Sequence, residues 1–218
     1  MTETATAERS TEACRRPGRQ PMPEAERCRL LTEAAETVFL RDGYLAASMD
    51  DVARCAGMSK RTLYQHYPSK AALFEATIEA MLAPLSFDTE LEREPDLARA
   101  LVGIVEAAGR HLLALRQHAL FRLVISEVPR SPELAEAFHR ATFGRGASAL
   151  ERRLAGEIRA GRLRIADARE AANMLFGMSF GATHIQALLG LRALPDESEI
   201  ARLSQAAVSV FLRGALVR

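Results

Sequence analysis

Side chains that can donate hydrogen bonds are concentrated in one short stretch of the chain, Ser59 to Tyr67. The stretch reads Ser-Lys-Arg-Thr-Leu-Tyr-Gln-His-Tyr. As a helix, it would carry its first four polar residues in the first turn, where they can reach base edges and phosphates in the major groove of DNA. Leu63 would face inward and anchor the helix. The pattern therefore predicts a helix whose N-terminal end reads DNA.

Residues further along the same stretch favour contacts with the DNA backbone. Hydroxyl and imidazole groups of Tyr64, His66 and Tyr67 can donate to phosphate oxygens, which fix the register of a protein on DNA without reading its sequence. Lys70 falls in the first turn of the next expected helix, where a cation opposes the helix dipole. Its presence makes sense if that helix end meets a phosphate, so we expect Lys70 to contact one.

Capping residues and apolar spacing indicate the helices that would position this stretch. An i, i+3/i+4 apolar stripe runs from Glu24 and stops at Asp42-Gly43, where glycine supplies the left-handed turn. Ser48 and Asp51 form an expected capping box for a second short helix that ends near Ala56-Gly57. Ser59 caps the third helix, which Pro68 stops, and Ser69 caps a fourth that ends before Pro84.

The remainder of the chain also has helical periodicity, and no segment alternates as a strand would. After a loop around Ser86 to Pro95, we expect helices at roughly Asp96–Gln117, Ala119–Val128, Pro132–Ala160, Asp167–Gly190 and Asp196–Leu216. No stretch is apolar enough for a membrane span, and the first residues lack the pattern of a signal peptide. We therefore expect an all-α protein in the cytoplasm, with no membrane partner.

Placement of charge is more informative than its amount. Residues 1–70 carry 11 basic and 10 acidic side chains, and residues 71–218 carry 18 of each, so bulk charge does not indicate DNA. However, the only two lysines, Lys60 and Lys70, lie close to the only three tyrosines, Tyr44, Tyr64 and Tyr67. Elsewhere arginine carries all the positive charge. The local use of lysine and tyrosine indicates a constraint specific to this segment.

Catalytic and metal-binding patterns are missing from the sequence. Cys14, Cys28 and Cys55 form no CxxC pair, which argues against a zinc site or a disulfide framework. There is no HExxH, P-loop or GxSxG motif, so we expect no catalytic residue, no metal and no cofactor. A helix, glycine turn and helix also occur in many all-α proteins. An all-α enzyme or ligand carrier with these helices as scaffold is therefore the alternative function.

Four runs of residues near the N-terminus closely resemble the tetracycline-repressor (TetR/AcrR) family of regulators. They are Phe39-Leu40-Arg41-Asp42-Gly43-Tyr44, Ser48-Met49-Asp50-Asp51-Val52-Ala53, Ala56-Gly57-Met58-Ser59-Lys60-Arg61-Thr62-Leu63-Tyr64 and Tyr67-Pro68-Ser69-Lys70-Ala71-Ala72-Leu73-Phe74. The resemblance implies a three-helix helix-turn-helix DNA-binding domain and a C-terminal helical domain that binds a ligand and dimerises. We accordingly expect a flexible tail at 1–22, the DNA-binding domain at 23–70 and the effector-binding and dimerisation domain at 71–218.

The family pattern further implies a homodimer on a palindromic operator in double-stranded DNA, usually as a repressor. The residues expected to bind DNA are Ser48, Ser59, Lys60, Arg61, Thr62, Tyr64, Gln65, His66, Tyr67 and Lys70. Arg61 departs from the small residue often found at its position, and either a guanine contact or a second phosphate contact fits it. Arg15-Arg16-Pro17-Gly18-Arg19 in the tail either enters a minor groove or is only a disordered segment.

In the C-terminal part, the last two expected helices are candidates for the dimer interface. Asn173, Gly177 and Gly181 form a row of small side chains flanked by Met174, Phe176, Met178 and Phe180, and the final helix carries Ile200, Leu203, Ala207, Val210 and Phe211. The same stripes would also suit an intramolecular core. For an unknown small hydrophobic or amphiphilic effector, the candidate residues are His111, His118, Phe121, Met174, Met178 and His184. Taken singly, each histidine fits a hydrogen-bonded or exposed residue better than an effector contact.

Overall fold

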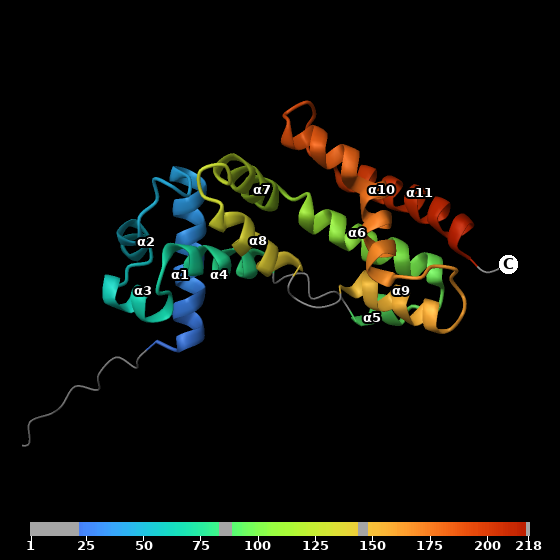
Figure 1. Cartoon of the computed structure of the whole chain (residues 1–218), viewed down its shortest axis with the longest axis horizontal. Coiled ribbons are helices and arrows are strands. Elements are labelled where there is room, and N and C mark those ends of the chain that lie inside the picture. The colour runs from blue at the N-terminus through green and yellow to red at the C-terminus, as the bar shows by residue number, and fades with distance from the viewer. Residues whose placement is uncertain (1–21, 83–88, 144–147, 217–218) are drawn as a thin grey trace, which may run out of the picture.

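The computed structural model describes residues 22–82, 89–143 and 148–216, and these residues form helices joined by short connections (Figure 1). The helices are α1 (Glu24–Asp42), α2 (Met49–Cys55), α3 (Lys60–His66), α4 (Lys70–Leu82), α5 (Thr89–Arg93), α6 (Leu97–Leu112), α7 (Leu115–Glu127), α8 (Glu133–Phe143), α9 (Ala149–Arg159), α10 (Ala168–Leu188) and α11 (Glu197–Ala215). Over these ranges the only β-type pairing is one isolated bridge between Leu163 and Leu216. The all-α prediction is confirmed. None of the described helices is both long and apolar enough to cross a membrane.

The N-terminal helices begin and end at the residues that the capping pattern predicts. Ser48 Oγ accepts a hydrogen bond from Asp51 N at 3.1 Å and donates one to the Asp51 carboxylate at 2.5 Å. The Asp51 carboxylate also accepts from the Ser48 backbone N–H, which completes the capping box. Ser59 Oγ accepts from the backbone N of Thr62 at 3.1 Å, so it caps α3. Gly43 follows α1 with a φ of +81°, a conformation that side-chain-bearing residues rarely adopt.

Two hydrophobic cores lie at opposite ends of the elongated chain in Figure 1. The first core contains residues of α1, α2, α3, α4, α7 and α8. It includes the rings of Phe39, Tyr44 and Phe74, whose centroids are 5.2 to 5.7 Å apart. The second joins α6, α9, α10 and α11. Helices α4, α7 and α8 thus share a core with the helix-turn-helix. The domain boundary after residue 70 stays a prediction.

Three expected helix boundaries in the C-terminal part are wrong. The stretch expected as one helix over Asp96–Gln117 ends at Leu112, and α7 begins at Leu115. No proline or glycine marks this bend; α6 packs in the second core and α7 in the first, so packing separates them. Similarly, Pro132–Ala160 is divided into α8 and α9, with Ser148 capping α9. The expected loop before Pro95 contains the short helix α5.

Candidate nucleic-acid interface

Helix α3 presents a polar face to solvent while one leucine holds it to the protein. The Leu63 side chain is 0% exposed and belongs to the first core. Lys60, Arg61 and Gln65 are exposed, and Tyr64 is 43% exposed. Thr62 is half-buried, and its hydroxyl lies 2.8 Å from Ser59 Oγ. The face therefore combines cationic, amide and phenol donors on a rigidly anchored helix, as direct reading of base edges requires.

Carboxylates of α2 pair with two of the three Lys and Arg side chains of α2 and α3. Lys60 Nζ lies 2.7 Å from Asp50 Oδ1, and Arg54 lies 2.8 Å from Asp51 Oδ1. Among the residues that the structure describes, Arg61 has no carboxylate partner within ion-pair distance. The sequence prediction did not include Asp50 as a functional residue. Its position in a helix start resembles an ordinary dipole-favoured acid, so no signal distinguished it.

The last two residues of the predicted reading stretch turn toward α1 rather than outward. His66 Nδ1 lies 3.7 Å from Cys28 Sγ, and His66 and Tyr67 are both half-buried. Burial raises the pKa of the Tyr67 hydroxyl, with a further contribution from its contact with Cys28. These contacts fix the end of α3 against α1. We infer that His66 and Tyr67 position the helix; their predicted base and phosphate contacts stay a prediction.

Lys70 has a structural role within the chain, and its predicted phosphate contact stays a prediction. Its Nζ donates to the backbone oxygens of Tyr44, Leu45 and Ala47 at 2.7, 3.2 and 3.1 Å. The same ammonium group lies 4.5 Å from the centroid of the Tyr44 ring. Since an ammonium group has three donors, these carbonyls use all of them. Lys70 therefore ties the start of α4 to the turn between α1 and α2.

Replacing Lys70 by methionine tests this role. The variant would leave three carbonyl groups, two of them in partly buried contacts, without their donor, so we expect the free energy of unfolding to fall by about 1–3 kcal/mol. Denaturant unfolding followed by circular dichroism measures the change. Lys70→Arg, which keeps the cation but changes its geometry, should lose less. Unchanged stability together with weaker DNA binding would instead favour the phosphate contact.

The structure says little about DNA contacts by Ser48 or by the arginines of the N-terminal tail. Ser48 is exposed, but its hydroxyl is engaged in the capping box of α2. The arginines of the tail, with Cys14, lie outside the described residues. The residues that the structure brings together on one exposed face are Ser59, Lys60, Arg61, Thr62, Tyr64 and Gln65.

The predicted effector residues divide into an inward cluster and an outward pair. The His184 ring lies 6.5 Å from that of His118 and 4.9 Å from that of Phe121, centroid to centroid. His118 Nδ1 and His184 Nε2 are buried and have no hydrogen-bond partner among the described residues. Met174 and Met178, by contrast, are 54% and 49% exposed, so they do not join this cluster. Surface hollows of about 380 and 400 Å³ lie elsewhere, beside His139 and beside Cys28.

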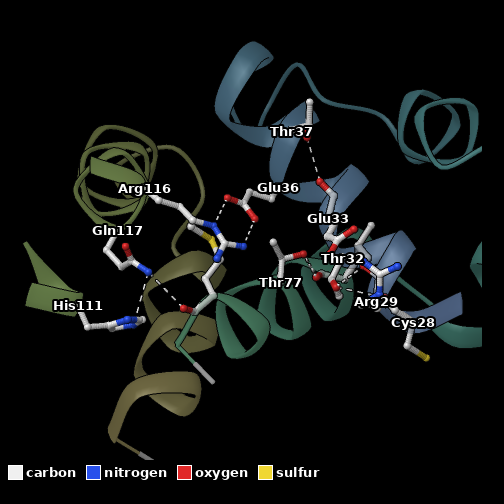
Figure 2. A network of polar contacts seen from close by, with 12 residues as sticks. Cys28, Arg29, Thr32, Glu33, Glu36, Thr37, Thr77, His111, Arg116 and Gln117 are labelled. Atoms are coloured by element: carbon white, nitrogen blue, oxygen red, sulfur yellow. Dashed lines mark hydrogen bonds and ion pairs between the residues drawn. The ribbon is translucent and has the colours of Figure 1, made fainter. Parts of the chain in front are cut away.

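Helix α7 connects the histidine cluster to the helix-turn-helix. Its first turns carry Arg116, which forms a two-pronged ion pair with Glu36 of α1, and Gln117, which donates to the backbone oxygen of Met81 at 3.3 Å (Figure 2). Gln117 Nε2 also lies 3.5 Å from His111 Nε2 on α6. His118 follows directly in the chain. A movement of the N-terminal end of α7 would therefore be transmitted to α1 through this ion pair.

Acid is expected to destabilise the protein through these histidines. Burial lowers the pKa of His111, His118 and His184, and nearby Arg116, Arg122 and His118 respectively lower each further. The unfolded chain then binds more protons than the folded one, so stability falls as pH drops below the unfolded value of about 6.5. Denaturant unfolding from about pH 7.5 to about pH 5 measures this. His184→Gln should flatten the dependence; an unchanged slope would contradict it.

The outer face of α10 is apolar, and no other described segment of the chain covers it. A Cβ atom built on Gly177 or Gly181 would meet nothing within 4 Å. The large apolar side chains exposed along α10, the turn after it and α11 are Met174, Met178, Ile185, Leu189, Leu191 and Val210. Much of the predicted α11 stripe has a different role, because Ile200, Ala207 and Phe211 are buried in the second core.

Comparison with known proteins places both parts of the chain in one family. A family model described as "Bacterial regulatory proteins, tetR family" matches residues 31–77, and one described as "AefR-like transcriptional repressor, C-terminal domain" matches residues 99–214. The crystal structure of a TetR-family regulator from Mesorhizobium loti superposes with a TM-score of 0.76 at 25% identity, covering 90% of this chain and 100% of that one.

Curated relatives match over part of the chain. The transcriptional activator FasR of Mycolicibacterium smegmatis is 47% identical over 58 residues, 27% of this chain and 26% of that protein. The transcriptional repressor TetR of Mycobacteroides abscessus is 33% identical over 110 residues, 50% of this chain and 56% of that protein. The chain thus spans between a quarter and just over half of their lengths. Taken with the fold and the two family models, these matches show that the chain belongs to the TetR family of bacterial transcriptional regulators.

Proposed function

We propose that this regulator is a repressor that binds a palindromic operator as a homodimer and is released by a small hydrophobic or amphiphilic molecule. The observation that carries the proposal is the exposed polar face of α3 on its buried Leu63 anchor. Arg61, Tyr64 and Gln65 have side chains long enough to reach base edges and phosphates. Each is available to solvent, so none must be uncovered before binding.

The outer face of α10 and the exposed part of α11 form the proposed dimer interface. Gly177 and Gly181 permit close approach of a second helix, and Met174 and Met178 supply apolar surface beside them. Exposed apolar surface of this extent is typical of a protein interface. A two-fold symmetric dimer carries two copies of α3, one for each half-site of a palindrome.

The inward cluster of His118, Phe121 and His184 is the proposed contact region for the effector. Two unpartnered imidazole nitrogens are available to a polar group of the ligand, and the neighbouring aromatic rings suit an apolar body. To contact these rings, the effector would separate α7 from α10. The Arg116–Glu36 ion pair would then transmit the movement of α7 to α1. A changed distance between the two copies of α3 would no longer match half-sites about 34–36 Å apart.

Repression is the proposed outcome because the C-terminal family model is that of a repressor, although one curated relative is named an activator. The test begins with selection of bound duplexes from a random pool by the purified protein. We expect an inverted repeat whose half-sites are about one helical turn apart. A promoter carrying that repeat should be less active when the protein is present. A pool with no enriched sequence would overturn the proposal, and higher promoter activity would overturn repression alone.

A further inference from the structure

The Lys60–Asp50 ion pair places a carboxylate beside the N-terminal end of the proposed reading face. Lys60 is the first residue of α3 and Asp50 lies in α2, and their charged atoms are 2.7 Å apart. Both side chains are exposed, at 59% and 53%. Asp51 is engaged with Ser48 and Arg54, whereas Lys60 is the one ion-pair partner found for Asp50 among the described residues. Asp50 is therefore the carboxylate that must share the groove with whatever Lys60 contacts.

Non-specific DNA offers this pair little. Lys60 would have to leave Asp50 to bind a phosphate, and the carboxylate would then stand unpaired beside a polyanion. Non-specific affinity depends almost wholly on cations that neutralise phosphates. Of the Lys and Arg side chains on α2 and α3, only Arg61 has no carboxylate partner in the described structure. The pair thus removes one cation from non-specific binding.

A G·C base pair, by contrast, satisfies both groups together. In the major groove guanine presents the O6 and N7 acceptors and cytosine presents the N4 amino donor. O6 and N4 are hydrogen-bonded to each other, which places them about 2.9 Å apart. The Lys60 ammonium and the Asp50 carboxylate offer a donor and an acceptor at a similar separation. Lys60 can donate to guanine while Asp50 accepts from the cytosine amine, and their ion pair need not break.

We propose that Asp50 is a specificity-determining residue, which with Lys60 reads one G·C base pair in each half-site and weakens binding to all other DNA. This inference rests on the proposed function, since it requires α3 to enter the major groove. It assigns a role in recognition to an acidic residue that net charge alone would count as unfavourable for DNA binding.

The first experiment needs no operator. Binding of the full-length protein to a fluorescent duplex of scrambled sequence is measured by anisotropy over a range of salt concentrations. Asp50→Asn should free Lys60 for one more phosphate. The salt slope should then steepen by about 0.9, and affinity at about 0.1 M salt should rise about eightfold. Glu136→Gln on α8 makes the same charge change at an exposed, distant site and should have no effect. An Asp50→Asn slope equal to that of wild type would overturn the charge effect.

The second experiment uses the selected operator, with each G·C pair replaced in turn by A·T. Wild type should lose roughly tenfold or more in affinity at one pair per half-site. Asp50→Ala, which removes the acceptor that asparagine would keep, should lose discrimination at that pair only. Asp50→Glu, which keeps the charge, should retain the weak non-specific binding. Discrimination by Asp50→Ala equal to that of wild type at every pair would overturn the base-pair reading. A wild-type protein without any sequence preference would overturn the proposed function, while the scrambled duplex would still decide the charge effect. Melting temperatures near that of wild type show that each variant is folded.

Discussion

Replacing Arg61 and Tyr64 together by alanine is expected to weaken operator binding about 100-fold or more. Both side chains are exposed on α3, and neither has an ion-pair partner or a buried position to lose. A contact with a base or phosphate contributes about 1–3 kcal/mol, so the loss of two contacts gives this change in affinity. Fluorescence anisotropy with the selected operator measures it. The free energy of unfolding should stay close to that of wild type.

The control for this double variant is Arg159→Ala on α9. It removes one exposed positive charge far from α3, so it should leave operator binding unchanged. The single variants divide the effect: Tyr64→Phe removes only the hydroxyl and shows whether a phosphate contact is lost. Operator binding at wild-type strength by the double variant would contradict the assignment of this face.

Replacing Gly177 by arginine is expected to separate the dimer. A Cβ atom at this position meets nothing within 4 Å in the isolated chain, so the folded subunit tolerates the side chain. At the proposed interface the same side chain would place an unpaired charge between two helices, at a cost of about 3–5 kcal/mol. The dissociation constant of the dimer should rise more than about 100-fold. Light scattering after size exclusion should show a monomer.

Gly156→Arg on α9 is the matched control, because a Cβ atom on this helical glycine also meets nothing within 4 Å. It should leave the oligomeric state and operator affinity unchanged. A Gly177→Arg protein that remains dimeric would contradict the use of this face. Operator affinity should fall when dimerisation is lost, since each subunit would then bind its half-site alone.

Local features of the N-terminal helices could be predicted from the sequence because short-range chemistry decides them. Ser48, Ser59 and Ser69 cap their helices as expected, since each needs only a backbone N–H group two or three residues ahead. Leu63 is buried as the spacing predicts. Residues within one turn of each other determine these features, so a single sequence contains the necessary information.

Long-range contacts explain much of what the sequence does not predict. The dipole position of Lys70 indicates a phosphate contact, which stays a prediction, but not the carbonyl groups more than twenty residues earlier to which Lys70 donates. No proline or glycine marks the bend between α6 and α7; the two helices diverge because they pack in different cores. In both cases the contacting residues lie too far along the chain for periodicity to identify them. Met174 and Met178 are apolar like core residues, yet they lie on an outer face, and periodicity alone does not distinguish these two positions.

The most direct test of DNA recognition by α3 is the ratio of two dissociation constants at physiological salt. One is measured for the selected operator and the other for a duplex of the same composition in scrambled order. A sequence-specific regulator that uses the exposed face from Ser59 to Gln65 should prefer the operator by at least about a thousandfold. The Arg61→Ala/Tyr64→Ala variant should lose most of that preference. A ratio near one for wild type, or a full ratio in the variant, would contradict the account.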